Sequence, residues 1–238
     1  HGHLQGWADE SIFAADDIDS LTNTGKYPFI VSMNCLTGYF AYPDPDPLAV
    51  SFAELLLRAE QKGAAAALMP TGMTTTGGQE ILNNALFEAI FTDDVRTLGP
   101  AIAAAKQTLL ANGSTEYEQI SKTFLLFGDP ATALKVPLPR RVTGVRARRE
   151  EKGRRIFWNA AFDCNGAAVA GYNIYRAASA AGPFSKINTA LITDTYFYDT
   201  DSGVGIAAGG GAESGGYYAV TAVDGGGTES VQSLAVKP

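Results

Sequence analysis

The sequence is poor in cysteine and histidine and contains no long hydrophobic run. It has two cysteines and two histidines in 238 residues. Cys35 and Cys164 fall in segments that we predict to be different domains, which argues against a framework of disulfides. No apolar run approaches the roughly 18 to 20 residues that a membrane span requires, and the N-terminus lacks the basic and apolar regions of a signal peptide. We therefore predict no membrane-spanning helix.

Positive charge is scarce in the first part of the chain. Residues 1–137 hold seven Lys and Arg against sixteen Asp and Glu, whereas residues 138–238 hold eleven against nine. The net charge of −7 therefore resides in the first part. Binding to nucleic acid depends on clustered Lys and Arg that neutralise phosphates. We do not expect nucleic acid as a partner.

An initiator methionine is also absent, since the chain starts at His1. With 46% hydrophobic and 18% charged residues, the chain has the composition of a globular protein and is long enough for two modest domains. We expect it to be a fragment or a processed product of a longer protein. On this expectation, further strands and any export signal lie upstream.

The first half of the chain alternates between predicted strands and helices. Short runs that are apolar on both faces predict buried strands, and apolar residues at helical spacing predict helices. This alternation is typical of an α/β domain with a mostly parallel sheet and flanking helices. The predicted strands are 26–34, 64–69 and 124–127, and the predicted helices are 52–61, 79–91 and 100–111, with a Thr/Gly-rich loop at 70–78.

The composition changes after about residue 136. Two prolines and two arginines make a stiff linker at this point. Short alternating stretches follow, separated by turns rich in Gly, Asp and Ser, and they predict an all-β sandwich. We interpret the Gly-rich segment 203–216 as a loop because no helix follows it. The predicted domains are 1–136 and 142–238 with a linker at 137–141, and the predicted strands are 142–148, 155–159, 171–176, 184–187, 196–199, 217–224 and 229–236.

Cys35 and His1 are the strongest candidates for catalysis. Cys35 comes at the end of a predicted buried strand, and the reactive groups of open α/β sheets collect at the carboxyl ends of strands. A nucleophilic thiolate needs a proton-transfer partner, and a neutral imidazole can fill that role near pH 7. The alternative is an inert buried cysteine, with His1-Gly2-His3 as the remnant of an expression tag.

Several motifs, in their order and spacing, resemble the gingipain family of caspase-like cysteine peptidases. The resemblance covers about residues 1–136 and implies a caspase-like α/β domain that is truncated at its N-terminus. The motifs are His1-Gly2, Trp7-Ala8-Asp9, Asn34-Cys35-Leu36-Thr37-Gly38-Tyr39-Phe40, and the segments 51–56, 63–67 and 126–130.

This resemblance implies a bacterial cysteine endopeptidase that is extracellular or on the cell surface and acts on proteins or peptides. His1 would be the catalytic histidine and Cys35 the nucleophile, while the backbone amides of Gly2 and Cys35 would stabilise the oxyanion. We expect no cofactor and no metal site. Calcium is common among the relatives, but no residue here can be assigned to it.

The Thr/Gly-rich loop leaves a strand end beside the expected cysteine site, so we expect it to form a wall of the specificity pocket. Arginine-specific members of the family have a tryptophan in this region and an acidic residue upstream of the His segment. This sequence has neither, so a preference for Arg or Lys is not carried over. The loop residues are Thr71, Gly72, Met73, Thr74, Thr75 and Thr76.

The second half resembles fibronectin type III modules over about residues 138–238. The resemblance rests on Trp158, Tyr172 and Tyr218, which we expect to fill a sandwich core and not to form a ligand platform. Such a module implies contacts with the cell surface or with other proteins. The basic stretch 140–155 is expected to be a solvated strand face; its alternatives are a contact with an anionic surface and an exposed cleavage site.

Two other functions stay open at this point. One is a non-catalytic, peptidase-like scaffold or adhesion protein whose sandwich binds partners. The other is an α/β hydrolase, which the absence of a Gly-x-Ser-x-Gly elbow disfavours. We expect His3 to be exposed or packed in a loop, because no cluster of ligand residues accompanies it as a zinc site would require.

Overall fold

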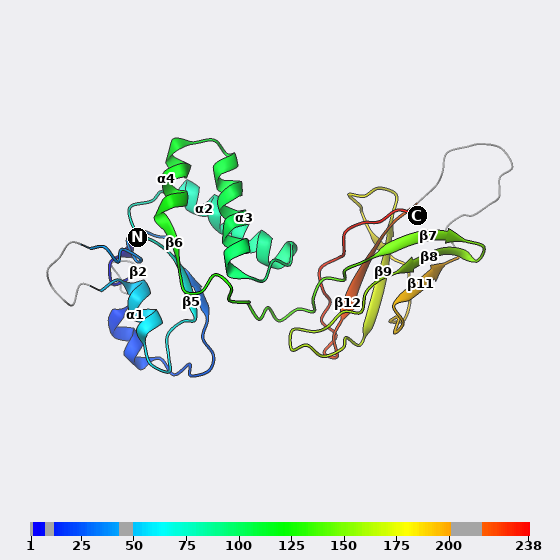
Figure 1. Cartoon of the computed structure of the whole chain (residues 1–238), viewed down its shortest axis with the longest axis horizontal. Helices are drawn as coiled ribbons and strands as arrows, with labels where there is room; N and C mark the ends of the chain where they lie inside the picture. Colours follow the sequence, from blue (N-terminus) through cyan, green and yellow to red (C-terminus); the bar gives the residue numbers. More distant parts are fainter. Residues whose placement is uncertain (1, 8–11, 43–49, 201–215) are drawn as a thin grey trace. The chain divides into compact units, whose positions relative to one another are not determined.

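The computed structural model describes residues 2–7, 12–42, 50–200 and 216–238 (Figure 1). The chain forms two compact units, one ending at Leu134 and the other starting at Lys135. Each unit has a hydrophobic core of its own. His1 and nearly all of the predicted loop 203–216 lie outside the described residues.

A three-stranded sheet in the order β4-β5-β6 forms the centre of the first unit. β4 (Phe29–Val31) pairs in parallel with β5 (Ala66–Pro70), whereas β6 (Phe124–Phe127) is antiparallel to β5. The prediction of a mostly parallel sheet is therefore wrong for these strands. β6 begins directly after α4 (Thr115–Thr123), without a loop between them. The chain therefore cannot reverse its direction between this helix and the strand, and β6 enters the sheet antiparallel to β5.

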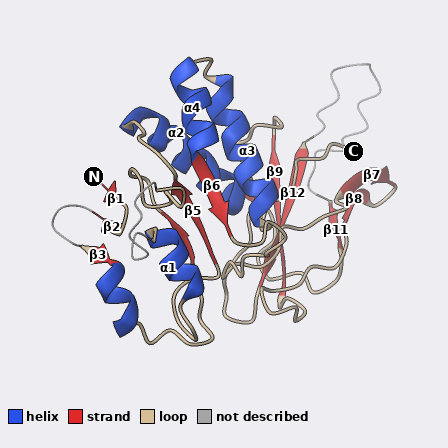
Figure 2. Ribbon diagram, turned by 60° about the vertical axis from the view of Figure 1, so that its left-hand side comes forward, coloured by secondary structure: helices blue, strands red, loops and turns tan. Residues whose placement is uncertain are grey.

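Helices cover both faces of this sheet (Figure 2). α1 packs on Ala67 and Met69 of β5. Because side chains alternate along a strand, Ala66 and Leu68 point to the opposite face, and both are fully buried. α2, α3 and α4 lie on that side (Figure 2). The helices are α1 (Phe52–Arg58), α2 (Thr76–Phe87), which continues as the π-helix η2 (Glu88–Thr92), and α3 (Leu98–Ala111).

Local sequence explains both ends of α1. Ser51 Oγ accepts a hydrogen bond from Glu54 N (3.4 Å), and Ser51 N donates to Glu54 Oε2 (3.1 Å), which forms a capping box. After the helix, Gly63 has a φ of +84°, and a Cβ there would lie 2.0 Å from the carbonyl oxygen of Leu56. Only glycine fits this turn, which returns the chain to the sheet.

A small antiparallel sheet, which periodicity does not predict, precedes the central one. It consists of β1 (Gly2–His3), β2 (Gly6–Trp7) and β3 (Phe13–Ala14), followed by the 3₁₀ helix η1 (Ala15–Ser20). Strands of two residues are too short to show an alternating pattern. The rings of Trp7 and Phe13 pack edge-on at 5.7 Å, so this sheet joins the core under α1.

The second unit is a β-sandwich of two antiparallel, three-stranded sheets. One has the order β11-β8-β7 and the other β10-β9-β12. Trp158, Tyr172 and Tyr218 are buried between them, as predicted. The strands are β7 (Arg146–Glu150), β8 (Gly153–Phe157), β9 (Gly171–Ala177), β10 (Ser185–Lys186), β11 (Tyr196–Asp199) and β12 (Tyr217–Val223).

The predicted seventh strand, 229–236, runs beside β12 without forming a continuous ladder. Tyr218 N donates to Val236 O (2.8 Å) and Val236 N donates to Tyr218 O (2.9 Å). Between these ends the hydroxyls of Ser230 and Ser233 accept from Ala222 N and Val220 N at 3.0 Å each. Serine side chains thus take the place of backbone acceptors, and the strand is reduced to isolated bridges.

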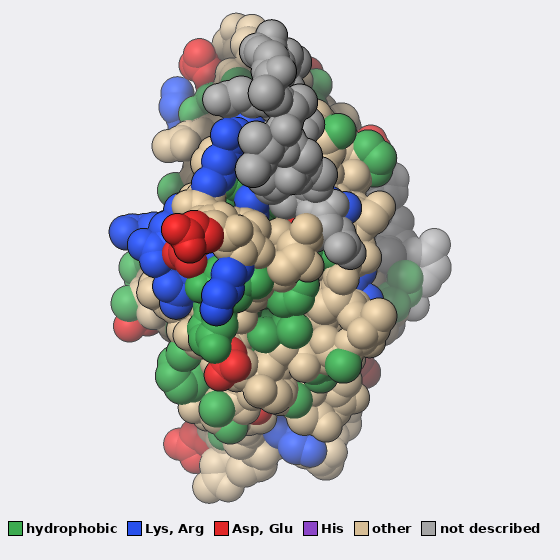
Figure 3. All heavy atoms as spheres, turned by 90° about the vertical axis from the view of Figure 1, so that its right-hand side faces the viewer, with side chains coloured by type: hydrophobic (Ala, Val, Ile, Leu, Met, Phe, Trp, Pro, Cys, Tyr) green, Lys and Arg blue, Asp and Glu red, His purple; other side chains and the backbone are tan. Residues whose placement is uncertain are grey.

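A buried polar cluster joins the two sheets of the sandwich. Tyr218 OH donates to Asp199 Oδ2 (2.6 Å), and Arg176 Nη1 donates to the same oxygen (2.8 Å). Arg154 Nη1 donates to Tyr218 OH (3.3 Å), and Arg154 is buried. The expectation of a solvated basic face is therefore wrong for Arg154, whose side chain points inward from β8. Figure 3 shows other Lys and Arg side chains gathered on the surface of this unit.

Among the residues that the structure describes, no helix combines the length and the apolar character that crossing a bilayer requires.

Candidate active site

Cys35 lies in a loop that leaves the carboxyl end of β4. Ser32 N donates to Leu68 O (3.0 Å) and so extends the pairing of β4 with β5 by one residue. Beyond it, Leu36 N donates to Gly72 O (3.2 Å) and Gly38 N donates to Pro70 O (2.9 Å). The cysteine loop is therefore joined by backbone hydrogen bonds to the end of the neighbouring strand. The sequence predicts Cys35 directly after a buried strand 26–34; β4 is shorter and partly buried, and Cys35 lies four residues beyond its last residue.

The residue after the cysteine has an uncommon backbone conformation. Leu36 has a φ of +63°, in the left-handed region. A non-glycine residue there costs on the order of 1–3 kcal/mol and persists only where surrounding contacts impose it. Backbone strain of this kind concentrates at functional sites, so it supports a role for the loop that carries Cys35.

The sulfur of Cys35 is half-buried against the Thr/Gly-rich loop. Thr74 N donates to Sγ at 3.5 Å, and the carbonyl and hydroxyl oxygens of Thr74 lie 3.6 and 3.7 Å from Sγ. The structure thus brings Cys35 together with one residue of the predicted loop. Thr76 is instead the first residue of α2, so that helix begins three residues before the predicted position.

Gln79 is a residue of this site that the sequence analysis missed. Its Nε2 donates to Asn34 O (3.0 Å) and to Thr74 Oγ1 (2.6 Å), while Thr74 Oγ1 donates to Asn34 O (2.7 Å). One side chain from the first turn of α2 therefore holds both segments that meet at the sulfur. A glutamine in a helical turn carries no sequence signal of such a role.

Gly2 packs directly against the cysteine loop. A Cβ on Gly2 would lie 2.4 Å from Cγ and Nδ2 of Asn34 and 2.7 Å from the carbonyl oxygen of Cys35. Two of the predicted site residues, Gly2 and Cys35, are therefore close in space. His1, the third, lies outside the described residues, and its separation from Cys35 stays a prediction.

A chain of hydrogen bonds connects the side chain of Asn34 to Thr37, Ser32 and Trp7. Thr37 Oγ1 lies 2.9 Å from Asn34 Oδ1 and 3.3 Å from Ser32 Oγ, which in turn accepts from Trp7 Nε1 at 2.7 Å. Thr37 and Ser32 are buried. This chain of polar groups connects the small N-terminal sheet to the residue that contacts Gly2.

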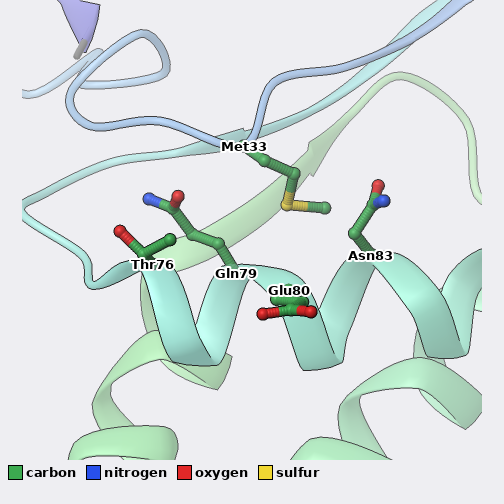
Figure 4. A pocket seen from close by; sticks show the side chains of 5 residues that line it. All are labelled: Met33, Thr76, Gln79, Glu80 and Asn83. Atoms are coloured by element: carbon green, nitrogen blue, oxygen red, sulfur yellow. The ribbon is translucent and has the colours of Figure 1, made fainter.

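A hollow of about 300 Å³ opens beside the cysteine loop, between the segment before Cys35 and α2 (Figure 4). Met33 forms one wall, and side chains of α2 form the other (Figure 4). The lining contains one carboxylate. The lining residues are Met33, Thr76, Gln79, Glu80 and Asn83. Thr76 is the residue of the predicted specificity loop 71–76 that lines this hollow.

His3 and the other potential metal ligands form no cluster within the described part of the chain. His3 is exposed, and its Nδ1 accepts a hydrogen bond from Gln5 N at 3.3 Å, which fits the expected loop-packing role. No group of three or more His, Cys, Asp or Glu residues that could hold a metal ion occurs among the residues described.

The first unit is thus an α/β domain in which a half-buried cysteine lies in the loop after a strand, and Met33 of the same loop lines a hollow. Residues 1–135 match Peptidase family C25, and the chain belongs to this family.

Among curated proteins, it is 26% identical over 147 residues to Gingipain R2 and to Gingipain R1 of Porphyromonas gingivalis. These alignments cover 58% of this chain but 19% and 14% of the two relatives, so the chain spans less than a fifth of their length.

Similarity to solved structures was also found. A protease structure superposes with a TM-score of 0.51 at 17% identity, covering 100% of this chain and 52% of that one. The crystal structure of the Arg-specific cysteine proteinase gingipain R gives 0.49 at 20% identity, covering 100% and 51%. An Fn3-like protein from Clostridium thermocellum gives 0.32 at 31% identity, covering 42% and 90%.

Proposed function

We propose that the first unit hydrolyses peptide bonds with Cys35 as the nucleophile and His1 as the proton donor. The observation that carries this proposal is the placement of the Cys35 sulfur, half-buried at a strand end and in contact with Thr74, with Gly2 packed against the same loop. Membership of a peptidase family supports the reaction class.

The chemistry follows the usual course of acyl transfer. The thiolate of Cys35 attacks the substrate carbonyl, and the carbonyl oxygen becomes an oxyanion that the amides of Gly2 and Cys35 stabilise. The C–N bond then breaks, and His1 gives a proton to the leaving amine. Water hydrolyses the remaining thioester, which releases the acid and restores the thiol.

The hollow beside Met33 and Gln79 is the proposed place for a substrate side chain, with the loop 71–76 as its neighbour. Glu80 is its charged lining residue. A carboxylate there favours a cationic side chain, which agrees with the arginine specificity stated for the related gingipain R. The proposed preference for a cationic side chain rests on Glu80 itself, because the chain is only 20% identical to gingipain R.

The setting of the enzyme forms part of the proposal. We place it outside the cell or on the cell surface of a bacterium, with proteins or peptides as substrates. The peptidase domain would be 1–136 and the sandwich 142–238, a fibronectin type III-like module that contacts other molecules.

The test compares two cysteine variants of the natural protein that carries this chain. We expect Cys35→Ala to abolish cleavage of a mixed peptide library read by mass spectrometry, and Cys164→Ala, the matched control in the sandwich, to retain it. His1→Ala should also lose cleavage. Cleavage that survives Cys35→Ala would refute the mechanism. A natural protein that cleaves nothing would favour the non-catalytic scaffold.

A further inference from the structure

The outer face of the β7-β8-β11 sheet carries a compact set of arginine and aromatic side chains. Ala147, Ile156 and Phe197 of these strands belong to the core, so their neighbours in sequence point outward. The register aligns the outward residues in two rows across the sheet. The rows are Arg146–Phe157–Tyr196 and Arg148–Arg155–Tyr198, with Glu150 at the end of β7; we call these seven residues the outer face.

Arg155 stands at the centre of this outer face. Its guanidinium carbon lies 5.1 Å from the ring centre of Tyr196, 5.7 Å from that of Phe157 and 5.9 Å from that of Tyr198. Arg148 lies 5.6 Å from the ring of Phe157. Stacking on rings holds a guanidinium flat and partly dehydrated while its N–H groups stay available to an anion. Arg148 and Arg155 already lie 2.6 and 3.9 Å from Glu150 Oε1, so a further carboxylate would bind to the remaining N–H groups of the two guanidinium groups.

Glu150 gives the outer face an acceptor of hydrogen bonds. Tyr198 OH donates to Glu150 Oε2 (2.8 Å), and Arg148 Nε donates to Oε1 (2.6 Å). The bond from Tyr198, followed by that from Arg148, lowers the pKa of Glu150 below its ordinary value. The carboxylate therefore stays ionised and can accept from a hydroxyl group of a ligand.

The simplest explanation of this pattern is cross-strand pairing that stabilises the sheet. Such pairing leaves the side chains exposed to solvent, so it is compatible with binding of a ligand on the same face. Tyr196 is 41% exposed, and the side chain of Arg148 is 57% exposed. The sandwich core already contains its large aromatics, so these rings are not needed there. Tyr and Arg are the residues enriched at binding surfaces.

We propose that the outer face binds an acidic polysaccharide whose sugars carry carboxylates. The exposed part of the Tyr196 ring, where Arg155 does not cover it, can pack against the C–H groups of a sugar ring. Arginine forks pair with carboxylates in two parallel hydrogen bonds, and Glu150 accepts from sugar hydroxyls. The aromatic rings, the arginine guanidinium groups and the Glu150 carboxylate together match a ligand that has hydroxyl groups and carries carboxylates at intervals.

Two other polyanions fit the outer face less well. A single-stranded nucleic acid carries a phosphate at every residue, and Glu150 would repel that charge. An acidic peptide supplies carboxylates but few hydroxyl groups from which Glu150 could accept hydrogen bonds. Both are outcomes that the experiment distinguishes.

The experiment measures retardation of the whole chain in native gels that contain polygalacturonate, with dextran as the neutral control. We expect retardation by polygalacturonate, weakened by added salt. Arg155→Gln and Tyr196→Ala should each weaken binding about tenfold, the loss expected for one charge-assisted contact or one stacked ring. Lys186→Gln makes the same charge change on exposed β10 of the other sheet and should leave binding unchanged.

Thermal unfolding of each variant separates loss of binding from loss of folding. Arg146→Gln, on the exposed rim, is the further variant if Arg155→Gln unfolds, and it should also weaken retardation. The proposal is overturned if dextran retards the chain equally or if polygalacturonate does not. It is also overturned if oligo-thymidylate or polyglutamate binds more tightly than polygalacturonate, or if Lys186→Gln has the same effect as the outer-face variants.

Discussion

Replacement of Gly2 by alanine tests the proposed site at the point where its two segments touch. The new methyl group would lie 2.4 Å from Asn34 and 2.7 Å from the carbonyl oxygen of Cys35. Ordinary van der Waals contact begins at 3.4 Å, so the two segments would have to separate by about 1 Å. The side chain of Asn34 is held by Thr37 and cannot simply swing away.

The magnitude follows from the sensitivity of catalysis to geometry. A displacement of about 1 Å of a positioning group costs roughly a hundredfold in rate, which corresponds to about 2.7 kcal/mol of transition-state stabilisation. Gly2 is also a proposed oxyanion donor, and in that role its amide would interact with the transition state more strongly than with the substrate. We therefore expect the loss from Gly2→Ala mainly in kcat and less in KM.

The assay is kcat/KM of the natural protein on a peptide that it cleaves. Gly77→Ala is the matched control, because its nearest neighbour is Tyr117 Oη at 3.8 Å and α2 tolerates alanine. We expect the control to keep full activity and to gain stability of up to about 1 kcal/mol. Activity of Gly2→Ala within about twofold of the wild type would refute the reasoning that the Gly2 segment belongs to the site.

Three further predictions concern the thiols, the polar contacts and the pH response. Limited iodoacetamide treatment should alkylate Cys35 before Cys164 in mass spectra, and the reverse order would remove support for an activated thiol. Gln79→Ala should lower stability by about 1–3 kcal/mol in urea unfolding, because it removes the two part-buried hydrogen bonds from Nε2 to Asn34 O and Thr74 Oγ1; an unchanged midpoint would contradict this. Burial, followed by the hydrogen bond to Glu229, raises the pKa of Tyr175 from 10.0 to about 12. Its contribution to stability is therefore complete below pH 10 and is lost as the pH rises toward about 12, so Tyr175→Phe should flatten the decline of the unfolding temperature over this range, and an equally steep decline would contradict it.

Part of the fold was predictable because short-range patterns and their turns coincide. The predicted strands 124–127 and 196–199 agree with β6 and β11 in both bounds. In each case an apolar or aromatic run stops at a turn residue. The direction of β6 was not predictable, because it depends on how α4 leads into the sheet and not on the composition of the strand. Strand pairing is a non-local property of the chain.

The same distinction applies to the candidate site. The position of Cys35 at a strand end and its contact with the following loop could be expected, because parallel strands end at one edge of a sheet. The role of Gln79 could not, since its partners are backbone and hydroxyl oxygens that any donor could satisfy. The packing of Gly2 on Asn34 was equally hidden, because contacts of this kind depend on tertiary structure alone.

The strained backbone at Leu36 is held by hydrogen bonds from the cysteine loop to the end of β5 and the segment that follows it. Leu36 keeps its positive φ at a cost on the order of 1–3 kcal/mol, and a glycine would remove that cost but would also allow the loop more conformations. The bonds from Leu36 and Gly38 to the end of β5 hold the strained form in place. If Cys35 is the nucleophile, as proposed, a sulfur held in this way would need little reorganisation to meet a substrate carbonyl. In the proposed mechanism, these hydrogen bonds would hold the Cys35 loop in the geometry that attack on a substrate requires.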